Sequence, residues 1–263
     1  MTKTWLPYVP AHVPVWRWPR KGVGVPTQYS APTSQLTADI DDYWWYDWTG
    51  QSRNSKHVPM AWGLGSLPAT IPASNNDGRP LLVLNEPDVV GQANCSPDQA
   101  ADFFHIWSQV WKGELWPLGT LAHNLDYVIR TMNSYEFRYG SWPGTGWAIH
   151  AYSNRAVWCL DLCQEYKLRI AVDDVRNFAA YMEGRGLLGR GIVISECGVL
   201  SAQYWHTTAE VAPAVQYLYR ELSALPYVRS VNWFSSYYAP CSSSDLVRLD
   251  GSLTECGQEW RRR

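Results

Sequence analysis

Long apolar runs are absent from this chain of 263 residues. No stretch approaches the ~18 consecutive apolar residues that span a bilayer, so we expect no membrane segment. The first residues, MTKTWLPYVP, lack the uninterrupted apolar region of a signal peptide. We therefore expect either a secreted protein whose leader has been removed or a cytoplasmic protein released by lysis.

An excess of one charge is also lacking. The chain has 22 Lys and Arg residues against 24 Asp and Glu residues, and the one block of like charge is the terminal run 261–263. Proteins that bind nucleic acid through a basic surface carry clustered Lys and Arg. The composition therefore argues against a nucleic-acid partner.

Cysteine pairs with the spacing of a complete metal site are missing too. Cys159 and Cys163 share one helical face and could offer two ligands, but no second pair completes the four of a structural zinc site. Cys241 and Cys256 bracket an irregular segment and are the one pair that we suspect of bridging. Elsewhere we expect buried reduced thiols, because a chain of this length needs no disulfides. We expect no metal and no organic cofactor.

Aromatic residues, in contrast, are abundant, with 16 Trp, 16 Tyr and 5 Phe. Residues 1–20 are rich in Trp and Pro and have neither a helical nor a strand period. We predict that they form an extended arm, laid over the surface or part of a binding face. Residues 21–263 are predicted to form a single domain.

Short apolar runs of strand length recur along that domain. The eight predicted strands are 22–25, 43–48, 58–62, 81–85, 116–120, 147–152, 191–196 and 228–234. Three amphipathic helices are predicted between the later strands. Ser96 would cap a helix over 97–112, with Gln99 as its capping-box partner, and apolar residues repeat at helical spacing over 175–182 and 211–225.

Strands that alternate with helices indicate a parallel sheet in an α/β protein. Eight strands in one domain of about 250 residues favour closure as a (β/α)8 TIM barrel over an open sheet. The interval between the second and third strands is too short for a helical crossover. We therefore expect reduced or missing helices in the first half of the barrel, unless one early strand is misassigned.

The carboxyl ends of barrel strands carry the active site. Aromatic and polar residues gather at these ends in the sequence. They are Trp45, Tyr46, Asp47 and Trp48 on the second strand, Met60, Ala61 and Trp62 on the third, Asn85 and Glu86 on the fourth, His150 and Tyr152 on the sixth, Glu196 on the seventh, and Trp233 and Phe234 on the eighth.

Glu86 and Glu196 each follow a strongly apolar run, LLVLN and GIVIS. A buried carboxylate costs several kcal/mol unless it is paired, protonated or used in chemistry. For either residue alone, an acid that caps the next helix is an equally good interpretation. Two such acids favour a glycosidase, in which one carboxyl protonates the leaving oxygen and the other attacks or activates water.

These residues resemble a known group of enzymes. Asn85-Glu86-Pro87 and Glu196 look like the acid/base and nucleophile segments of the clan A glycoside hydrolases, which are retaining (β/α)8 barrels. The ordered segments DYWWYDWTG, HVPMAWG, LLVLNEPDVVGQANCSPDQAA, WAIHAYS and IVISECG are similar to glycoside hydrolase family 128, whose members cleave β-1,3-glucans. The resemblance spans about residues 22–260, and LVRLDGSLTECGQEW is similar to the closing helix of such barrels.

The resemblance implies a role for each polar candidate. Glu86 would be the general acid/base, in the less polar setting, and Glu196 the nucleophile, with their carboxyls about 5 to 5.5 Å apart. Asn85 would hydrogen-bond the sugar 2-hydroxyl, unless it only closes a turn. His150 would orient the nucleophile or contact sugar, unless it is a structural histidine.

The resemblance also implies aromatic contacts with a glucan, because flat rings with a few polar groups bind the CH faces and hydroxyls of sugars. Trp233 would form the floor of the subsite beside the scissile bond. The residues that would contact the rest of the glucan are Trp45, Tyr46, Trp62 and Tyr152.

The sequence therefore predicts a monomeric, retaining endo-β-1,3-glucanase that forms a glycosyl-enzyme intermediate and has a polysaccharide as its partner. A hydrolase of the same clan acting on a β-1,4-glycan or a cell-wall sugar is an alternative. A transglycosylase differs only in acceptor access and is a further one. A non-catalytic carbohydrate-binding barrel is the alternative from another class, and the presence of both glutamates argues against it.

Overall fold

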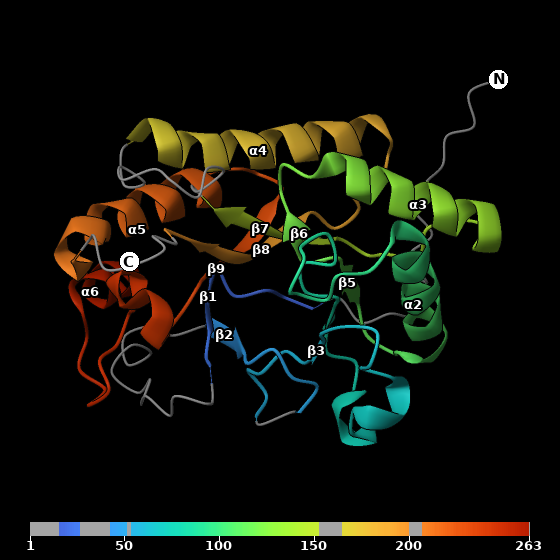
Figure 1. Ribbon diagram of the computed structural model, residues 1–263, viewed down its shortest axis with the longest axis horizontal. Helices are drawn as coiled ribbons and strands as arrows, with labels where there is room; N and C mark the ends of the chain where they lie inside the picture. Colours follow the sequence, from blue (N-terminus) through green and yellow to red (C-terminus); the bar gives the residue numbers. More distant parts are fainter. Residues whose placement is uncertain (1–15, 27–42, 52–53, 153–164, 200–206, 263) are drawn as a thin grey trace.

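The computed structural model describes residues 16–26, 43–51, 54–152, 165–199 and 207–262. Parallel strands lie at the centre, with α-helices above them and on both sides in the view of Figure 1. The strands are β1 (Lys21–Gly24), β2 (Tyr43–Tyr46), β3 (Met60–Ala61), β4 (Leu81–Val83), β5 (Leu115–Pro117), β6 (Thr120–Leu121), β7 (Trp147–Tyr152), β8 (Ile192–Gly198) and β9 (Val228–Trp233). The helices are α2 (Pro97–Val110), α3 (Leu125–Tyr139), α4 (Glu165–Gly184), α5 (Thr208–Ser223) and α6 (Glu255–Arg261).

The strand ladders are parallel and form two sheets, in the orders β2-β1-β9-β8-β7-β6 and β3-β4-β5. The last strand pairs with the first, since Val23 on β1 lies opposite Trp233 on β9. A parallel bridge between Trp45 and His57 joins the end of β2 to the segment before β3. The α/β class with parallel strands is confirmed, although over the described residues the ladders do not close into one ring.

One apolar interior nevertheless joins the two sheets. Side chains from β2, β3, β4, β5, β7 and β8 meet in an inner cluster that consists of Trp18, Trp44, Tyr46, Val58, Met60, Leu82, Trp116, Ala148 and Val193. A larger outer cluster lies between the strands and the helices. Successive side chains alternate between the two. Along β7, Ala148 belongs to the inner cluster, whereas Trp147 and Ile149 belong to the outer one.

All eight predicted strand segments contain an observed strand, and one of them is divided. The predicted strand 116–120 is split into β5 and β6 because Leu118 and Gly119 adopt positive φ angles of 84° and 34°. A Cβ atom on Gly119 would lie 2.7 Å from the carbonyl oxygen of Leu84. Only glycine fits this turn, which brings the end of β4 close to the start of β6.

The three predicted helices are also present. Helix α2 begins after Ser96, and the capping box with Gln99 is formed. Helix α3 was not predicted, although Asn124 is a residue type that often precedes a helix and Gly140 follows the last turn; the Asn124 side chain makes no cap hydrogen bond in the structure. Between β3 and β4 the chain forms only two short 3-10 helices, η2 (Pro68–Thr70) and η3 (Ala73–Asn75), as expected for the first half.

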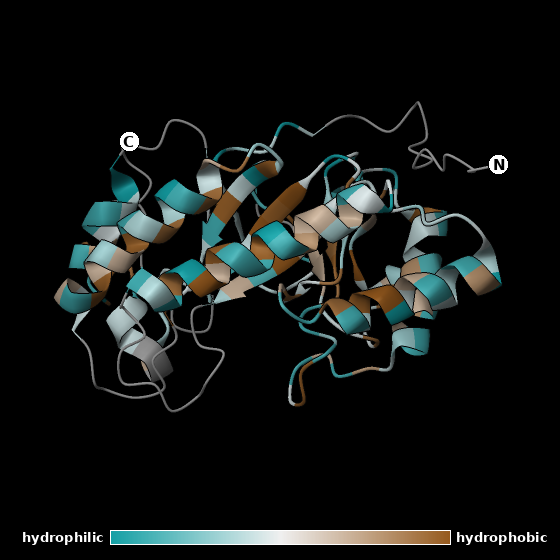
Figure 2. Ribbon diagram, turned by 90° about the horizontal axis from the view of Figure 1, so that it is seen from above, coloured by the Kyte–Doolittle hydropathy of each residue, from teal (hydrophilic) through white to brown (hydrophobic). Residues whose placement is uncertain are grey.

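Hydrophobic residues concentrate on the central strands, whereas the surrounding helices alternate between hydrophilic and hydrophobic (Figure 2). This pattern is typical of helices that cover a buried sheet with one face. In the part of the chain that the structure describes, no helix combines the length and the apolar character needed to cross a bilayer.

The described end of the N-terminal arm lies at the amino ends of the strands. The backbone N–H of Trp16 donates to Glu114 Oε1 at 3.1 Å, just before β5, and Trp18 packs in the inner cluster. Residues 1–15 lie outside the described residues. At the C-terminus, α6 agrees with the expected closing helix, and Lys21 Nζ donates to the Trp260 carbonyl at 2.7 Å.

The predicted cysteine chemistry is only partly covered by the described residues. Cys95 and Cys197 are buried thiols, as expected. Cys159 and Cys163 lie outside the described residues, as does the side chain of Cys241. Cys256 Sγ donates to the carbonyl oxygen of Thr208 at 3.2 Å, and its suspected bridge to Cys241 stays a prediction.

Candidate active site

Glu196 faces the interior because β8 contains a bulge. Ile194 packs in the outer cluster, and a regular strand would turn Glu196, two residues later, to the same side. The pairing with β7 shifts instead: Ile149 lies opposite Ile194, but the next residue, His150, lies opposite Glu196. One extra residue, Ser195, therefore turns Glu196 to the inner face, as bulges beside active sites often do.

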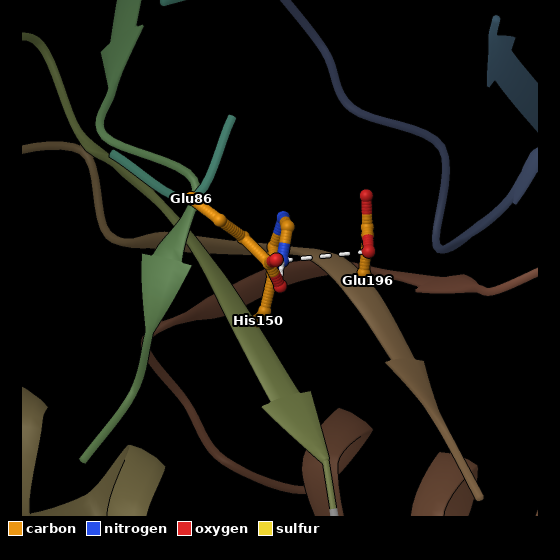
Figure 3. A group of neighbouring side chains, drawn as sticks. All are labelled: Glu86, His150 and Glu196. Atoms are coloured by element: carbon orange, nitrogen blue, oxygen red, sulfur yellow. Dashed lines mark hydrogen bonds and ion pairs between the residues drawn. The ribbon is translucent and has the colours of Figure 1, made fainter. Parts of the chain in front are cut away.

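Glu86 reaches the same place from the turn after β4. Leu84 and Glu86 have positive φ angles of 69° and 44°, so the chain bends sharply here. The Glu86 backbone N–H donates to the Gly119 carbonyl at 3.0 Å, which ties the bend to the turn between β5 and β6. The side chain extends toward His150 on β7 (Figure 3).

His150 lies between the two carboxylates (Figure 3). Its Nδ1 atom is 2.8 Å from Glu86 Oε1 and 3.4 Å from Glu196 Oε2. The imidazole is fully buried, which favours an orienting role over contact with sugar. One ligand atom from each of the three side chains lies within 4.8 Å of the others, so this trio could also offer ligands to a metal ion.

Three neutral donors hold Glu196. The Tyr46 hydroxyl and the Trp48 indole N–H both donate to Oε1 at 2.8 Å. The Tyr152 hydroxyl donates to Oε2 at 2.5 Å. Tyr46 and Tyr152 are thus brought to the site as predicted, but as partners of a carboxylate. Hydrogen bonds of this kind favour the ionised form of the acid.

The electrostatics of the trio are strongly coupled. Burial and the charge of Glu86 raise the pKa of Glu196, while His150, Tyr152 and Trp48 act against this shift. Burial lowers the pKa of His150, but the charges of the two glutamates outweigh it and the net shift is upward. The negative charge beside His150 therefore favours its cationic form.

The two glutamates differ in exposure. The Glu86 side chain is 12% exposed and that of Glu196 only 5%. Glu86 was expected to have the less polar setting. Its side chain is in fact the more exposed of the two. It does have fewer hydrogen-bond donors around it, because three donors surround Glu196 whereas the contact described for the Glu86 carboxylate is with His150.

Asn85 is buried beside Glu86. Its amide nitrogen donates to Gln92 Oε1 at 3.2 Å, and its Oδ1 has no hydrogen-bond partner among the described residues. A buried unpaired acceptor is costly, so this oxygen is available for a donor from a ligand.

The Cys197 thiol, next to Glu196, is buried and its pKa is raised, which makes it inert.

The structure does not bring Trp233 and Trp45 to the site. The Trp233 indole is fully buried in the outer cluster and donates to the Ser244 carbonyl at 2.9 Å, so it cannot form the floor of a sugar subsite. The Trp45 ring contacts His57 on the other face of β2 from Tyr46. Both predictions placed the residue at the correct end of its strand but on the wrong face of that strand.

Trp62 is half-buried and packs against the inner cluster, as Trp48 does, and its contact with a glucan stays a prediction. Two aromatic residues with a place at the site were not among the predicted site residues. Trp48 contacts Glu196, and its ring centroid lies 5.5 Å from that of Phe234, which is half-buried. Trp48 lies two residues after Tyr46. Because side chains two residues apart on a strand share a face, this spacing could have indicated that Trp48 faces the site.

Comparisons with known proteins bear on the family and the fold. The family model described as "Glycosyl hydrolase catalytic core" matches residues 24–260. No curated protein sequence matches the chain.

Several solved structures share the fold. An endo-β-1,3-glucanase of glycoside hydrolase family 128, subgroup I, from Amycolatopsis mediterranei, in complex with laminaritriose, has a TM-score of 0.69 and 20% identity, over 92% of this chain and 98% of that one. A subgroup II endo-β-1,3-glucanase from Pseudomonas viridiflava has a TM-score of 0.67 and 20% identity, over 93% and 97%. A curdlan-specific subgroup III exo-β-1,3-glucanase from Blastomyces gilchristii has a TM-score of 0.61 and 17% identity, over 92% and 97%.

The resemblance to family 128 seen in the sequence is thus confirmed in the fold, and the family model covers nearly the whole domain that carries Glu86 and Glu196. The chain belongs to the glycosyl hydrolase catalytic core family.

Proposed function

We propose that this protein is a retaining endo-β-1,3-glucanase of the family 128 type, with Glu86 as general acid/base and Glu196 as nucleophile. The observation that carries the proposal is the meeting of both carboxylates at one nitrogen, His150 Nδ1, at 2.8 and 3.4 Å. Two acids so close to each other, at the carboxyl ends of parallel strands, are what a glycosidase requires.

The separation of the acids supports retention of configuration. Oxygen atoms of Glu86 and Glu196 approach within 4.8 Å of each other. Retaining enzymes have carboxyls about 5 to 5.5 Å apart, whereas inverting enzymes need about 6.5 to 9.5 Å to admit a water molecule. The short separation leaves no room for water between the nucleophile and the anomeric carbon.

The reaction then has two steps. A Glu196 oxygen attacks the anomeric carbon while protonated Glu86 gives its proton to the glycosidic oxygen, which leaves as the hydroxyl of the departing sugar. In the second step Glu86 removes a proton from water, the water oxygen displaces Glu196, and the starting configuration returns. Tyr46, Trp48 and Tyr152 stabilise the carboxylate of Glu196 before attack and after release.

The choice of β-1,3-glucan rests on the structural neighbours. The two endo-acting neighbours have TM-scores of 0.69 and 0.67, above the 0.61 of the exo-acting one, which supports endo action. The half-buried aromatic residues Trp48, Trp62 and Phe234 offer apolar surface to the sugar faces, and the free Oδ1 of Asn85 offers an acceptor to a sugar hydroxyl.

The proposal includes closure of the strands as a (β/α)8 barrel. The strands follow one another in chain order, β9 returns to β1, and the inner cluster joins both sheets. These three features support a barrel whose ladder is interrupted between β2 and β3 and between β5 and β6.

Incubation of the purified protein with laminarin, a mixed-linkage glucan and a β-1,4-glucan tests the function. We expect oligosaccharides from laminarin, with the β-anomer formed first. Products of the α-anomer would contradict the retaining mechanism, and hydrolysis of the β-1,4-glucan alone would move the assignment to another substrate. In Glu196→Ala, azide is expected to restore turnover and to give a glycosyl azide of the α-configuration, a result that a merely structural glutamate would not give.

A further inference from the structure

A buried contact between an aspartate and a histidine lies directly behind the two residues that donate to Glu196 Oε1. Tyr46 and Trp48 both reach this oxygen, and Asp47, the residue between them, is buried as well. Asp47 Oδ1 lies 2.9 Å from His57 Nε2, and neither side chain is exposed. The roles proposed above for the site residues do not use this pair.

Asp47 is placed on the face of β2 opposite to Tyr46. The Tyr46 ring belongs to the inner cluster, whereas His57, the partner of Asp47, contacts the Trp45 ring with centroids 4.5 Å apart. The carboxylate of Asp47 therefore points away from Glu196, and its influence on the site must pass through the backbone of residues 46–48.

The same carboxylate also fixes the turn that carries Trp48. Asp47 Oδ1 accepts from the Thr49 hydroxyl at 2.7 Å and from the Thr49 backbone N–H at 3.2 Å, so the contact spans Trp48. Trp48 has a φ of 57°, in the left-handed region that costs a bulky residue of order 1 kcal/mol or more. The Thr49 carbonyl accepts from the Met60 backbone N–H at 2.9 Å and ties the far side of the turn to β3.

We propose that Asp47 and His57 are positioning residues, which act on Glu196 by holding Tyr46 and Trp48 so that both donate to the same carboxylate oxygen. The inference rests on the proposed role of Glu196 as nucleophile. Loss of the anchor releases the Trp48 turn, and a displacement of about 1 Å at a reacting group can lower a rate by about 100-fold.

The electrostatic consequence has a defined direction. Titratable groups that face Glu196 are Glu86, His150, Tyr46, Tyr152 and Cys197. Burial already raises the pKa of Glu196, and Trp48 is among the groups that oppose this rise. Removal of the donor raises the pKa further. The nucleophile must be ionised, so the acidic limb of kcat/KM moves to higher pH.

The test compares Asp47→Ala with Glu114→Gln, a change at a buried glutamate at the opposite end of the strands. We expect Asp47→Ala to lower kcat about 10- to 100-fold, with KM changed less than about threefold, and to shift the acidic limb upward. We expect Glu114→Gln to lower the melting temperature without moving that limb. His57→Gln, whose amide can replace the Nε2 donor, should keep most of the activity.

A second readout does not depend on turnover. The indole N–H resonance of Trp48, assigned by its loss in Trp48→Phe, should titrate with Glu196 in the wild-type protein and move upfield in Asp47→Ala. If the wild type hydrolyses no glucan but this resonance behaves as described, the proposed function fails while the positioning role stands.

Thr49→Val is the fallback if Asp47→Ala does not fold, because it removes one bond to Asp47 at a half-buried position. In this variant we expect smaller shifts of the acidic limb of kcat/KM and of the Trp48 indole resonance. An unmoved acidic limb together with an unmoved Trp48 resonance, in Asp47→Ala or in this variant, would overturn the proposal.

Discussion

Two buried glutamates lie at opposite ends of the parallel strands, and their charges are met in different ways. Glu114, just before β5, is 1% exposed and pairs with the Arg190 guanidinium. It also accepts from the Trp116 indole N–H at 2.8 Å. Glu196, on the carboxyl half of β8, is 4% exposed and accepts from neutral hydroxyl and indole donors, with His150 as its one titratable cation among the described residues.

Burial alone therefore does not mark a reactive acid. An arginine stays charged at all physiological pH values and fixes a carboxylate in its ionised, paired form. Neutral donors and a titratable histidine stabilise the charge but leave an oxygen able to form a new bond. The nature of the partner therefore separates the structural glutamate from the candidate nucleophile.

The largest expected effect is at Glu196. Glu196→Gln keeps the shape and an acceptor for Tyr46 and Trp48 but removes the nucleophilic charge, so kcat on laminarin should fall at least about 1,000-fold. The melting temperature should change little, because a neutral amide relieves the cost of a buried charge beside Glu86. Near-normal turnover of this variant would end the nucleophile assignment.

The matched change at the other end should have the opposite profile. Glu114→Gln leaves the half-buried Arg190 without its counter-charge and should lower the free energy of unfolding by about 2 to 3 kcal/mol. Urea unfolding measures this loss. Below the melting temperature kcat/KM should equal that of the wild type, and a large drop in kcat/KM would show that the two ends of the strands are coupled.

Another buried carboxylate, Asp245, sharpens the comparison because it has no charged partner described. Burial raises its pKa to about 7, although the backbone N–H of Tyr238 donates to it. Between pH 4 and 7, on the order of one proton more is bound by the native state than by the unfolded state, so stability falls as pH rises, by at most about 1.4 kcal/mol per pH unit. Asp245→Asn should flatten this slope in melting curves recorded across the range, and an unchanged slope would assign it to another group.

The smallest expected effect concerns the space behind Trp48. A Cβ atom on Gly24 would lie 2.7 Å from the tip of the Trp48 indole. Gly24→Ala should displace this donor from Glu196 and lower kcat about fivefold, with little effect on stability. Gly65→Ala is the matched control, because nothing lies within 4 Å of its added Cβ. Equal activity of both variants would show that the indole has room to adjust.

The sequence predicted the elements of the fold well where local chemistry is strong. The capping box at Ser96 and Gln99 set the start of α2, and the apolar runs before Glu86 and Glu196 marked β4 and β8. The prediction missed α3, whose N-cap Asn124 forms no capping box, and it missed the turn at residues 118–119, which divides a predicted strand. A motif whose hydrogen bonds join residues a few positions apart can be recognised in a sequence. A turn that is held by contacts with distant strands cannot.

The candidate site divides in the same way. The two acids, His150, Tyr46 and Tyr152 were predicted from their positions at strand ends, and the structure gathers them. Trp233 and Trp45 were misplaced because a strand end alone does not say which face a side chain takes, and a shift of one residue reverses it.

By itself the sequence determined the parallel α/β class, the order of the strands and the identity of the polar groups at their carboxyl ends, because hydrophobic period and residue type are local properties. Only the tertiary structure decided that Ser195 is the extra residue of a bulge and that Glu196 therefore faces inward. It also decided that Trp48 and Tyr46 converge on one oxygen while Asp47 turns away. These directions depend on pairing with strands far away in the chain, and no local pattern encodes that pairing.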